Sequence, residues 1–322
     1  MIEKFRRKYF DIALPFIILF GILILFGFTT KGTIYASSNL TVIVKQTLNV
    51  IIAALGMVFV AALGGTDINQ GSLIGFAGAC GTVAAIRYGL GAAVVTVVMA
   101  GLASGLFLGT VNARFKVPSF MCSLAMLIAL RALGTVAMGG STSGLVVPGF
   151  VIALDNMAIK VPIVIALIVV VAYVFHFTPF GAYCRAIGEN ENAMKFAGIN
   201  VNMIKIIAFG LSGLFTGIAS LFVLARVGGC STTLGLGFEM RVMMAMFIGG
   251  VPVSGGSGTK LYKILVGAFT ISILENGLVL TGSSGAITQL IRGLVLLVVV
   301  YLTTVVKNYM LQLNMNKKME VE

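Results

Sequence analysis

Two acidic side chains of this sequence interrupt long apolar stretches. Asp67 lies within GGTDINQGS (64–72), and Glu275 is followed by Asn276 within LVGAFTISILENGLVLTG. A carboxylate that is remote from water is costly unless it faces a cavity or a partner. These groups could therefore accept hydrogen bonds from the hydroxyls of a polar solute, or they could have a structural role.

Each carboxylate has a specific structural alternative. Asp67 precedes Gly71, and aspartate commonly caps the helix that it precedes. We expect capping to be its chief role, with direct solute contact as the alternative. Glu275 could form an ion pair with Arg131 or Arg292, which also fall within apolar stretches.

The sequence lacks the groupings of side chains that catalysis or metal binding requires. It has one histidine, His176, and its four cysteines are scattered without a C-x-x-C pair. The stretch GGSGTK (255–260) departs from the phosphate-binding pattern G-x-x-x-x-G-K-[ST]. We therefore expect no catalytic residue, no metal site and no bound cofactor on this chain, and we do not class it as an enzyme.

Composition identifies the elements that must position these residues. Hydrophobic residues make up 59% of the 322 positions and charged residues only 10%, and the mean hydropathy is +1.08. Soluble domains carry about 25% charged residues, and apolar runs of about 20 residues cross a membrane as helices. We predict an all-α polytopic membrane protein, a single domain over 1–322 with about ten transmembrane helices, several of them broken. The expected spans are 11–28, 47–63, 72–88, 91–112, 119–138, 160–177, 203–224, 238–250, 261–281 and 286–306.

The distribution of basic residues orients these spans. With the N-terminus inside, fourteen lysines and arginines fall in cytoplasmic segments and five fall outside. Such a bias is typical of cytoplasmic loops, so both termini are expected to be cytoplasmic. The net charge of +12 then reflects basic flanks against an anionic leaflet, and nucleic acid is not expected as a partner.

The stretch around Asp67 recurs in the second half of the chain. After a shift of 185 residues, GGTDINQGS (64–72) aligns with GGVPVSGGS (249–257), and a short apolar run precedes each copy. Paired interrupted segments in the two halves of a transporter indicate the pathway between them. We predict a two-half pseudo-repeat, about 47–138 and 203–306, with a pathway beside the breaks. The glycines expected to break the helices are Gly64, Gly65, Gly71, Gly249, Gly250 and Gly256.

Four stretches resemble motifs of a known transport family. They are GMVFVAALGGTDINQGSL (56–73), VNARFKVPSFMCSLAMLIALRALG (111–134), TPFGAYCRAIGENENAMKFAGINV (178–201) and GLGFEMRVMMAMFIGGVPVSGGSGT (235–259). In this order, over nearly the whole chain, they are similar to the permease subunits of sugar-type ABC importers, the ribose, xylose and galactose class. The chain departs from the family pattern at positions that include Gln70, Arg241 and Pro252, which leaves the solute open.

The interruptions and the motif matches together suggest two groups of functional residues. The candidate residues of the substrate pathway are Asp67, Asn69, Ser72, Asn112, Ser119, Phe120, Ser123, Glu275 and Asn276. The basic-residue count predicts that the loop 178–202 is cytoplasmic, and its residues 187–198 favour a short amphipathic helix. The resemblance implies that this helix docks in a groove of an ATP-binding subunit. The candidate coupling residues are Ile187, Gly188, Glu189, Asn190, Ala193, Phe196, Ala197 and Gly198.

The resemblance implies the permease of an ATP-driven, binding-protein-dependent importer in a bacterial cytoplasmic (inner) membrane. Its expected cargo is a monosaccharide, and a nucleoside or a furanose-type signalling molecule is the alternative. ATP and Mg would be bound by a partner ATPase with two nucleotide-binding domains. The other expected partners are a second permease, identical or paralogous, an extracytoplasmic solute-binding protein and lipid.

Two further alternatives concern charged residues. An ion-coupled secondary transporter would use Asp67 and Glu275 as an ionisable relay, although it would leave the coupling motif without a role. Glu239 and Arg241 would either meet the solute-binding protein or pair with each other across one helical turn.

Overall fold

Helices make up nearly all of the regular structure, as predicted. The computed structural model describes residues 2–140, 144–298 and 301. The long helices are α1 (Ile2–Thr29), α2 (Ser37–Ala62), α3 (Gln70–Tyr88), α4 (Leu90–Phe115), α5 (Ser119–Ala137), α7 (Met157–Phe177), α10 (Val201–Val227) and α12 (Leu261–Leu280). The short elements are η1 (Thr33–Tyr35), α6 (Gly149–Ile152), η2 (Ala153–Asp155), α8 (Pro179–Glu189), α9 (Glu191–Phe196) and α11 (Phe238–Ile248), together with the paired strands β1 (Leu145–Val146) and β2 (Gly229–Cys230).

Six helices in the described part of the chain are long and apolar enough to cross a membrane: α2, α4, α5, α7, α10 and α12. The apolar segments Ala13–Thr29 and Gly285–Val298 are shorter, and α11 has only 11 residues. Each of the ten predicted spans coincides with a helix. For the predicted span 286–306, residues 299–300 and 302–306 lie outside the described residues. Ten crossings therefore stay a prediction.

The largest boundary difference is at α2, which begins ten residues before the predicted span 47–63. The added turns carry polar residues, and neighbouring elements satisfy them. Asn39 Nδ2 donates to Asn276 Oδ1 at 2.9 Å. Lys45 Nζ lies 2.8 Å from Asp155 Oδ2, and the buried Lys160 Nζ lies 2.9 Å from Asp155 Oδ1.

The core forms around α2 and α10. Every residue of α2 from Thr47 to Ala62 is buried, and α10 packs against α2, α3 and α4. Glycines allow the closest approach: a Cβ at Gly101 of α4 would lie 2.9 Å from the Cα of Gly217 of α10. The glycine-rich segments of α4 and α10 thus pack backbone against backbone.

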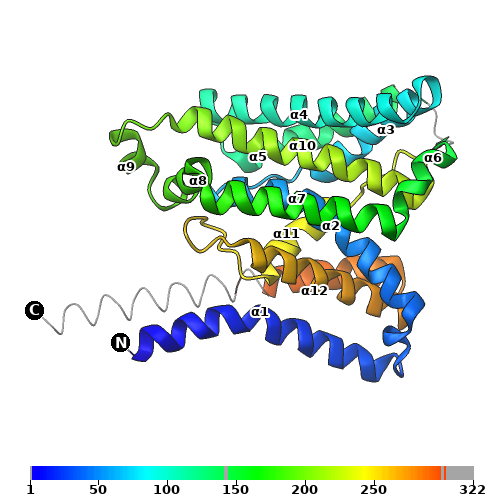
Figure 1. The fold of residues 1–322 in the computed structure, drawn as a ribbon, viewed down its shortest axis with the longest axis horizontal. Coiled ribbons are helices and arrows are strands. Elements are labelled where there is room, and N and C mark those ends of the chain that lie inside the picture. The colour runs from blue at the N-terminus through cyan, green and yellow to red at the C-terminus, as the bar shows by residue number, and fades with distance from the viewer. Residues whose placement is uncertain (1, 141–143, 299–300, 302–322) are drawn as a thin grey trace, which may run out of the picture.

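The helices run back and forth along the long axis of the molecule (Figure 1). The N-terminus, α8 and α9 lie at one end of the bundle, and α6 lies at the other (Figure 1). The outer helices α5 and α7 leave most of their apolar residues exposed, with only 22% of each apolar window buried. Such faces suit contact with lipid.

Candidate functional site

The first helix break, residues 63–69, joins α2 to α3. Gly64 has φ +75°, and the amide of Gly65 donates to the carbonyl oxygen of Val60 at 3.0 Å. This is a Schellman end, in which a glycine with positive φ terminates the helix. The glycine pair Gly64 and Gly65 therefore ends α2, as predicted from the sequence.

Asp67 is fixed within the protein by two hydrogen bonds. Its carboxylate is only 2% exposed. Oδ2 accepts from the hydroxyl of Ser212 of α10 at 2.8 Å, and Oδ1 accepts from the amide of Asn69 at 3.2 Å. Gln70 Nε2 donates to the same Ser212 oxygen at 3.3 Å. Asp67 thus ties the first break to the central helix α10.

The expected cap on a helix starting at Gly71 is corrected by this geometry. Helix α3 begins at Gln70, and its N-cap residue is Asn69, whose side chain makes no capping bond. Asp67 lies two residues before this N-cap, in the segment that leads into the helix. Gly71 lies in the first turn of α3 and breaks no helix; a side chain there would collide with the carbonyl oxygen of Gly235.

Three further polar residues lie buried at the start of α3. Asn69, Gln70 and Ser72 are each at most 1% exposed. Their oxygens Oδ1, Oε1 and Oγ have no hydrogen-bond partner in the described part of the chain. Buried polar atoms are normally satisfied by protein, water or ligand. Ser119 also meets this break, because its Oγ accepts from the amide of Thr66 at 3.1 Å.

The other pathway candidates on α4 and α5 have local partners. Asn112 Nδ2 donates to the carbonyl oxygen of Val117 at 2.8 Å and so closes the turn between the two helices. The Ser123 hydroxyl donates to the carbonyl oxygen of Phe120 at 3.1 Å. Phe120 itself is 53% exposed. These contacts do not join them to Asp67.

Glu275 and Asn276 lie on α12 and have separate partners. Glu275 Oε1 is 2.7 Å from Arg292 Nε and 3.1 Å from Arg241 Nε. Of the two arginines expected for Glu275, the structure therefore selects Arg292. Arg241 pairs with α12 and not with an acid of its own helix. Asn276 accepts from Asn39 of α2.

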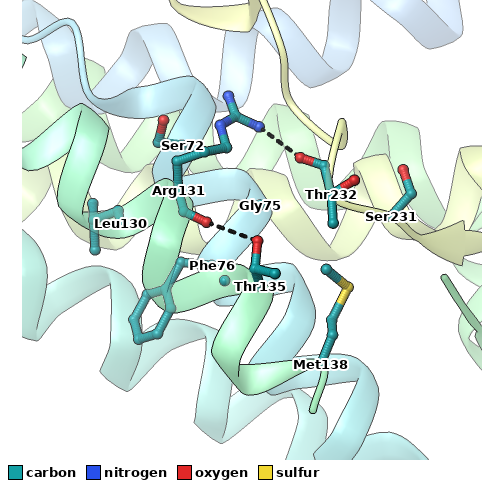
Figure 2. Close-up of a pocket in the computed structure, with 10 residues that line it drawn as sticks. Ser72, Gly75, Phe76, Leu130, Arg131, Thr135, Met138, Ser231 and Thr232 are labelled. Atoms are coloured by element: carbon teal, nitrogen blue, oxygen red, sulfur yellow. Dashed lines mark hydrogen bonds between the residues drawn. The ribbon is translucent and has the colours of Figure 1, made fainter. Parts of the chain in front are cut away.

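Arg131 has a different role, because its guanidinium does not reach Glu275. Its Nη1 donates to the carbonyl oxygens of Leu234 at 2.9 Å and Thr232 at 3.4 Å. Figure 2 shows this side chain beside a cavity of about 10 Å³ that Ser72 also lines. A space of this size holds about one water molecule. Arg131 thus fastens the segment before α11 to α5.

The second helix break, residues 249–260, joins α11 to α12. Gly250 has φ +83°, and the amide of Val251 donates to the carbonyl oxygen of Met246 at 2.9 Å. The end of α11 therefore has the same Schellman geometry as the end of α2, one residue later than the alignment predicts. Lys263 Nζ donates to the carbonyl oxygen of Gly250 at 2.8 Å.

The two breaks are in contact. The amide of Gly256 donates to the carbonyl oxygen of Ala62 at 2.9 Å. A Cβ on Gly255 would lie 2.7 Å from the carbonyl oxygens of Ala61 and Ala62. Only glycine fits this approach, and Gly255 and Gly256 both have positive φ. The predicted glycines Gly64 and Gly256 thus belong to one junction.

The end of α8 reaches this junction. A Cβ on Gly188 would collide with the carbonyl oxygen of Ala62 and would lie 2.6 Å from the amide nitrogen of Gly256. Glu189 Oε1 accepts from both the amide and the hydroxyl of Ser257, each at 2.7 Å. Three segments that are far apart in sequence therefore meet at one point.

The predicted helix over 187–198 is in fact the end of α8 followed by the six-residue helix α9. Asn190 caps α9, because its Oδ1 accepts from the amide of Ala193 at 3.0 Å. Gly198, with φ +79°, closes the segment. Ile187 is only 3% exposed, whereas Phe196 is 92% exposed. The exposed candidates are Glu189, Asn190, Ala193, Phe196, Ala197 and Gly198.

Glu191 holds α9 against α10. Its carboxylate lies 2.6 Å from Lys195 Nζ and 2.8 Å from Lys205 Nζ of α10. Burial raises the pKa of Glu191, but the hydrogen bonds and charges of the two lysines outweigh burial, so that its pKa lies below the usual range. The carboxylate is therefore ionised at neutral pH.

Sequence reasoning missed Ser212 and Ser257, which are the partners of Asp67 and Glu189. Ser212 lies within the small-residue stretch FGLSGLFTG, where it resembles a packing residue. No periodicity or spacing connects it to a position 145 residues earlier. Only the packing of α10 against the first break reveals this pair.

Comparison with known proteins adds to this geometry. A family described as the branched-chain amino acid transport system / permease component matches residues 39–300. The ribose import permease protein of Escherichia coli strain K12 is 32% identical over 284 residues, which cover 84% of this chain and 87% of that protein. The fructose import permease protein of Rhizobium meliloti is 28% identical over 302 residues, which cover 89% and 84%. The xylose transport system permease protein of Haemophilus influenzae is 26% identical over 368 residues, which cover 94% and 98%. No solved structure matches the chain.

Proposed function

Because this chain belongs to the branched-chain amino acid transport system / permease component family, among its sugar-type ABC import permeases, we propose that it carries a monosaccharide into the cell. The relatives named for ribose, xylose and fructose support this class of solute. None of these three is named for a nucleoside or a signalling molecule, so that alternative is less favoured. The observation that carries the proposal is the junction of α8 with both helix breaks.

In the proposed topology ten helices cross the membrane and both termini are cytoplasmic. The N-terminus, α8 and α9 lie at the same end of the bundle (Figure 1), which would be the cytoplasmic end. The shared Schellman ends of α2 and α11 support a pseudo-repeat of two halves. The C-terminal residues 302–322 lie outside the described residues, so their side of the membrane rests on the sequence.

The exposed part of α9 is the proposed docking surface for an ATP-binding subunit. Phe196 is an aromatic side chain that is almost fully exposed, and the small residues Ala193 and Ala197 are exposed beside it. A short helix of this kind fits a groove of a partner. ATP and Mg would be bound by that partner, which has two nucleotide-binding domains in our proposal.

The junction provides a route from this docking surface to the helix breaks. Displacement of α9 would move Glu189 and Gly188, and these residues contact Ser257 and Ala62. Nucleotide binding would then shift the populations of two states of the permease. A second permease, identical or paralogous, and an extracytoplasmic solute-binding protein complete the proposed importer.

An ion-coupled secondary transporter is less favoured by the same geometry. It would need carboxylates that exchange protons or ions along a path. Glu275 instead holds two arginines, and Asp67 accepts two hydrogen bonds from its neighbours. Both acids therefore already have structural partners.

The proposal is tested by uptake of radiolabelled ribose, xylose and fructose in cells that express the chain with its ATPase and binding protein. We expect uptake of at least one sugar, and we expect it to stop when the ATPase cannot hydrolyse ATP. Ala193→Arg should abolish uptake at unchanged membrane levels, whereas Ser37→Arg, at the exposed start of α2, should not. Uptake that continues without the ATPase would contradict the proposal.

Topology is tested by labelling. A cysteine substituted for Asn190 should resist a membrane-impermeant thiol reagent in intact cells and react after the cells are opened. The matched substitution Ser37→Cys, at the other end of the bundle, should react in intact cells. Labelling of the Asn190→Cys variant from outside would exclude a cytoplasmic coupling segment.

A further inference from the structure

A cavity of about 340 Å³ lies between α11 and the helix Gly285–Val298. Its lining residues on one side are Leu236, Gly237, Glu239, Met240 and Met244, and on the other side Gln289, Arg292, Gly293 and Leu296. None of them belongs to either helix break or to the candidate pathway residues. The volume falls within the range of sites that bind small molecules, about 300–1,000 Å³.

Three lining residues carry polar groups of complementary kinds. Glu239 offers a carboxylate, Gln289 an amide, and Arg292 a guanidinium. A sugar hydroxyl both donates and accepts a hydrogen bond, so donors and acceptors together suit it. Met240, which is 47% exposed, adds adaptable apolar surface for the carbon skeleton.

Arg292 is held in position by charge. Its Nε lies 2.7 Å from Glu275 Oε1, and Arg241 Nε lies 3.1 Å from the same oxygen. The Nη1 atom of Arg292 lies beside Gly237, 3.8 Å from the position that a Cβ would occupy there. Glu275 therefore fixes one edge of the guanidinium, while Nη1 lies near the Gly237 wall of the cavity.

The charges around the cavity balance formally. Of the lining residues, Glu239 carries one negative charge and Arg292 one positive charge. Unpaired charge would favour an ionic solute, whereas this balance favours a neutral polar one. Glu239 Oε2 is buried beside Gly71 of α3 and has no hydrogen-bond partner in the described part of the chain.

Such polar groups cannot face hydrocarbon without a large cost. The rim of the cavity is nevertheless open and apolar: Leu236 is 63% exposed and Met240 47%. An open cavity with an apolar rim fits a second permease, whose contact with the rim would close the chamber and keep lipid out. Water or solute would then fill the space beside Gln289 and Arg292.

We propose that this cavity is the chamber that holds the monosaccharide during transport, with Gln289 and Arg292 as specificity-determining contacts and Glu275 as the positioning residue for Arg292. This inference rests on the proposed function and adds to it a site that lies outside both helix breaks. A neutral monosaccharide binds through hydroxyl contacts to the amide and the guanidinium, and its ring packs on Met240.

Cysteine labelling tests access and occupancy in the complete importer. A cysteine substituted for Gln289 should react with a charged thiol reagent, and the reaction should slow when the importer turns over a sugar that wild type imports. Leu290→Cys, adjacent on the helix but outside the lining, should show no protection. Lack of reaction at Gln289→Cys, or equal rates with and without sugar, would overturn the inference.

Uptake tests the contacts themselves. Gln289→Ala should lower the maximal uptake rate about two- to ten-fold, the range that one hydrogen bond accounts for. The concentration for half-maximal uptake should change little, because the binding protein sets it. Leu294→Ala, outside the lining, should act as wild type.

Arg292→Lys should lower uptake further, and a folding defect would show as reduced membrane levels. Gln289→Ala should not cause a folding defect, because Gln289 is exposed, so its uptake reports on the contact alone. Unchanged uptake in Gln289→Ala for every imported sugar would overturn the inference while leaving the proposed function intact. If wild type imports no monosaccharide, the proposed function fails, and this inference fails with it.

Discussion

The two helix breaks begin with the same turn but are fastened in different ways. Both α2 and α11 end in a Schellman turn at a glycine with positive φ. The first break is tied inward, through the buried Asp67, to Ser212 of the central helix α10. The second is tied outward, through Ser257, to the exposed Glu189 of α8.

This difference indicates which break is the movable one. A buried hydrogen bond is strengthened by the low dielectric of the interior, and Asp67 is only 2% exposed. The bonds of Glu189 lie at an exposed site, where water competes for both partners. We infer that the first break is a fixed support and that the second follows the motion of α8 and α9.

The largest expected effect comes from the contact that joins both breaks. Gly188→Ala would place a Cβ against the carbonyl oxygen of Ala62 and the amide of Gly256, where only backbone atoms could yield. Overpacking of this kind costs about 1–3 kcal/mol. We expect uptake to be abolished while the permease still reaches the membrane, as measured by transport at matched protein levels.

A matched glycine provides the control. Gly91 lies in the first turn of α4, and a Cβ there would meet nothing within 4 Å. Gly91→Ala should therefore transport as wild type. Normal uptake in Gly188→Ala would show that the junction is looser than its geometry implies.

The second effect concerns the fixed break. Asp67→Leu would leave the Ser212 hydroxyl and the Asn69 amide without their acceptor, at about 1–3 kcal/mol for each buried group. We expect less folded protein, measured as the amount of monodisperse permease that is recovered after extraction in detergent. Asp67→Asn should be milder, because its amide oxygen can still accept one of the two bonds.

The same pair of variants separates support from solute contact. If Asp67→Asn keeps normal protein levels but loses nearly all uptake while ATP hydrolysis continues, Asp67 contacts the solute and our assignment is wrong. A further loss in the Asp67→Asn/Ser212→Ala double variant beyond the sum of the singles would also argue against a simple pair.

The third effect concerns the movable break. Glu189→Ala removes the acceptor for Ser257 but leaves the helix ends intact, so folding should be unchanged. We expect fewer sugar molecules imported per ATP hydrolysed, because motion of α9 no longer reaches the second break. The measurement is the ratio of uptake to ATP hydrolysis in proteoliposomes.

Glu191→Ala is the comparison for this variant. Glu191 is the neighbouring acid, and it binds Lys195 and Lys205 but does not contact a break. Its loss should loosen α9 on α10 and change the ratio less than Glu189→Ala does. Equal ratios in both variants would remove the special role of the Glu189 contact.

The smallest effect is expected from Ser257→Ala. Glu189 accepts from both the hydroxyl and the backbone amide of this residue, and the variant removes only the hydroxyl. One exposed hydrogen bond contributes about 0.5–1.5 kcal/mol. Uptake should fall slightly, by less than in Glu189→Ala. A larger loss than in Glu189→Ala would assign Ser257 a role beyond this pair.

The sequence by itself determined the membrane class, the helical segments and the positions where α2 and α11 end. These features follow from local composition: apolar runs form helices in a membrane, and adjacent glycines end them. The coupling role of the segment 187–198 stays a prediction from its motif. The span predicted for α2 began ten residues too late, at residue 47, because polar residues such as Asn39 occupy the first turns of this helix.

Only the tertiary structure decided the partners of the isolated polar residues. Asp67 accepts a hydrogen bond from Ser212, and Glu189 accepts one from Ser257. Glu275 forms ion pairs with Arg292 and Arg241 and not with Arg131. Each pair joins segments that are distant in sequence, so periodicity and spacing carry no information about it. The packing of α10, α12 and α8 sets those distances, and the cost of an unpaired buried charge then selects among the available partners.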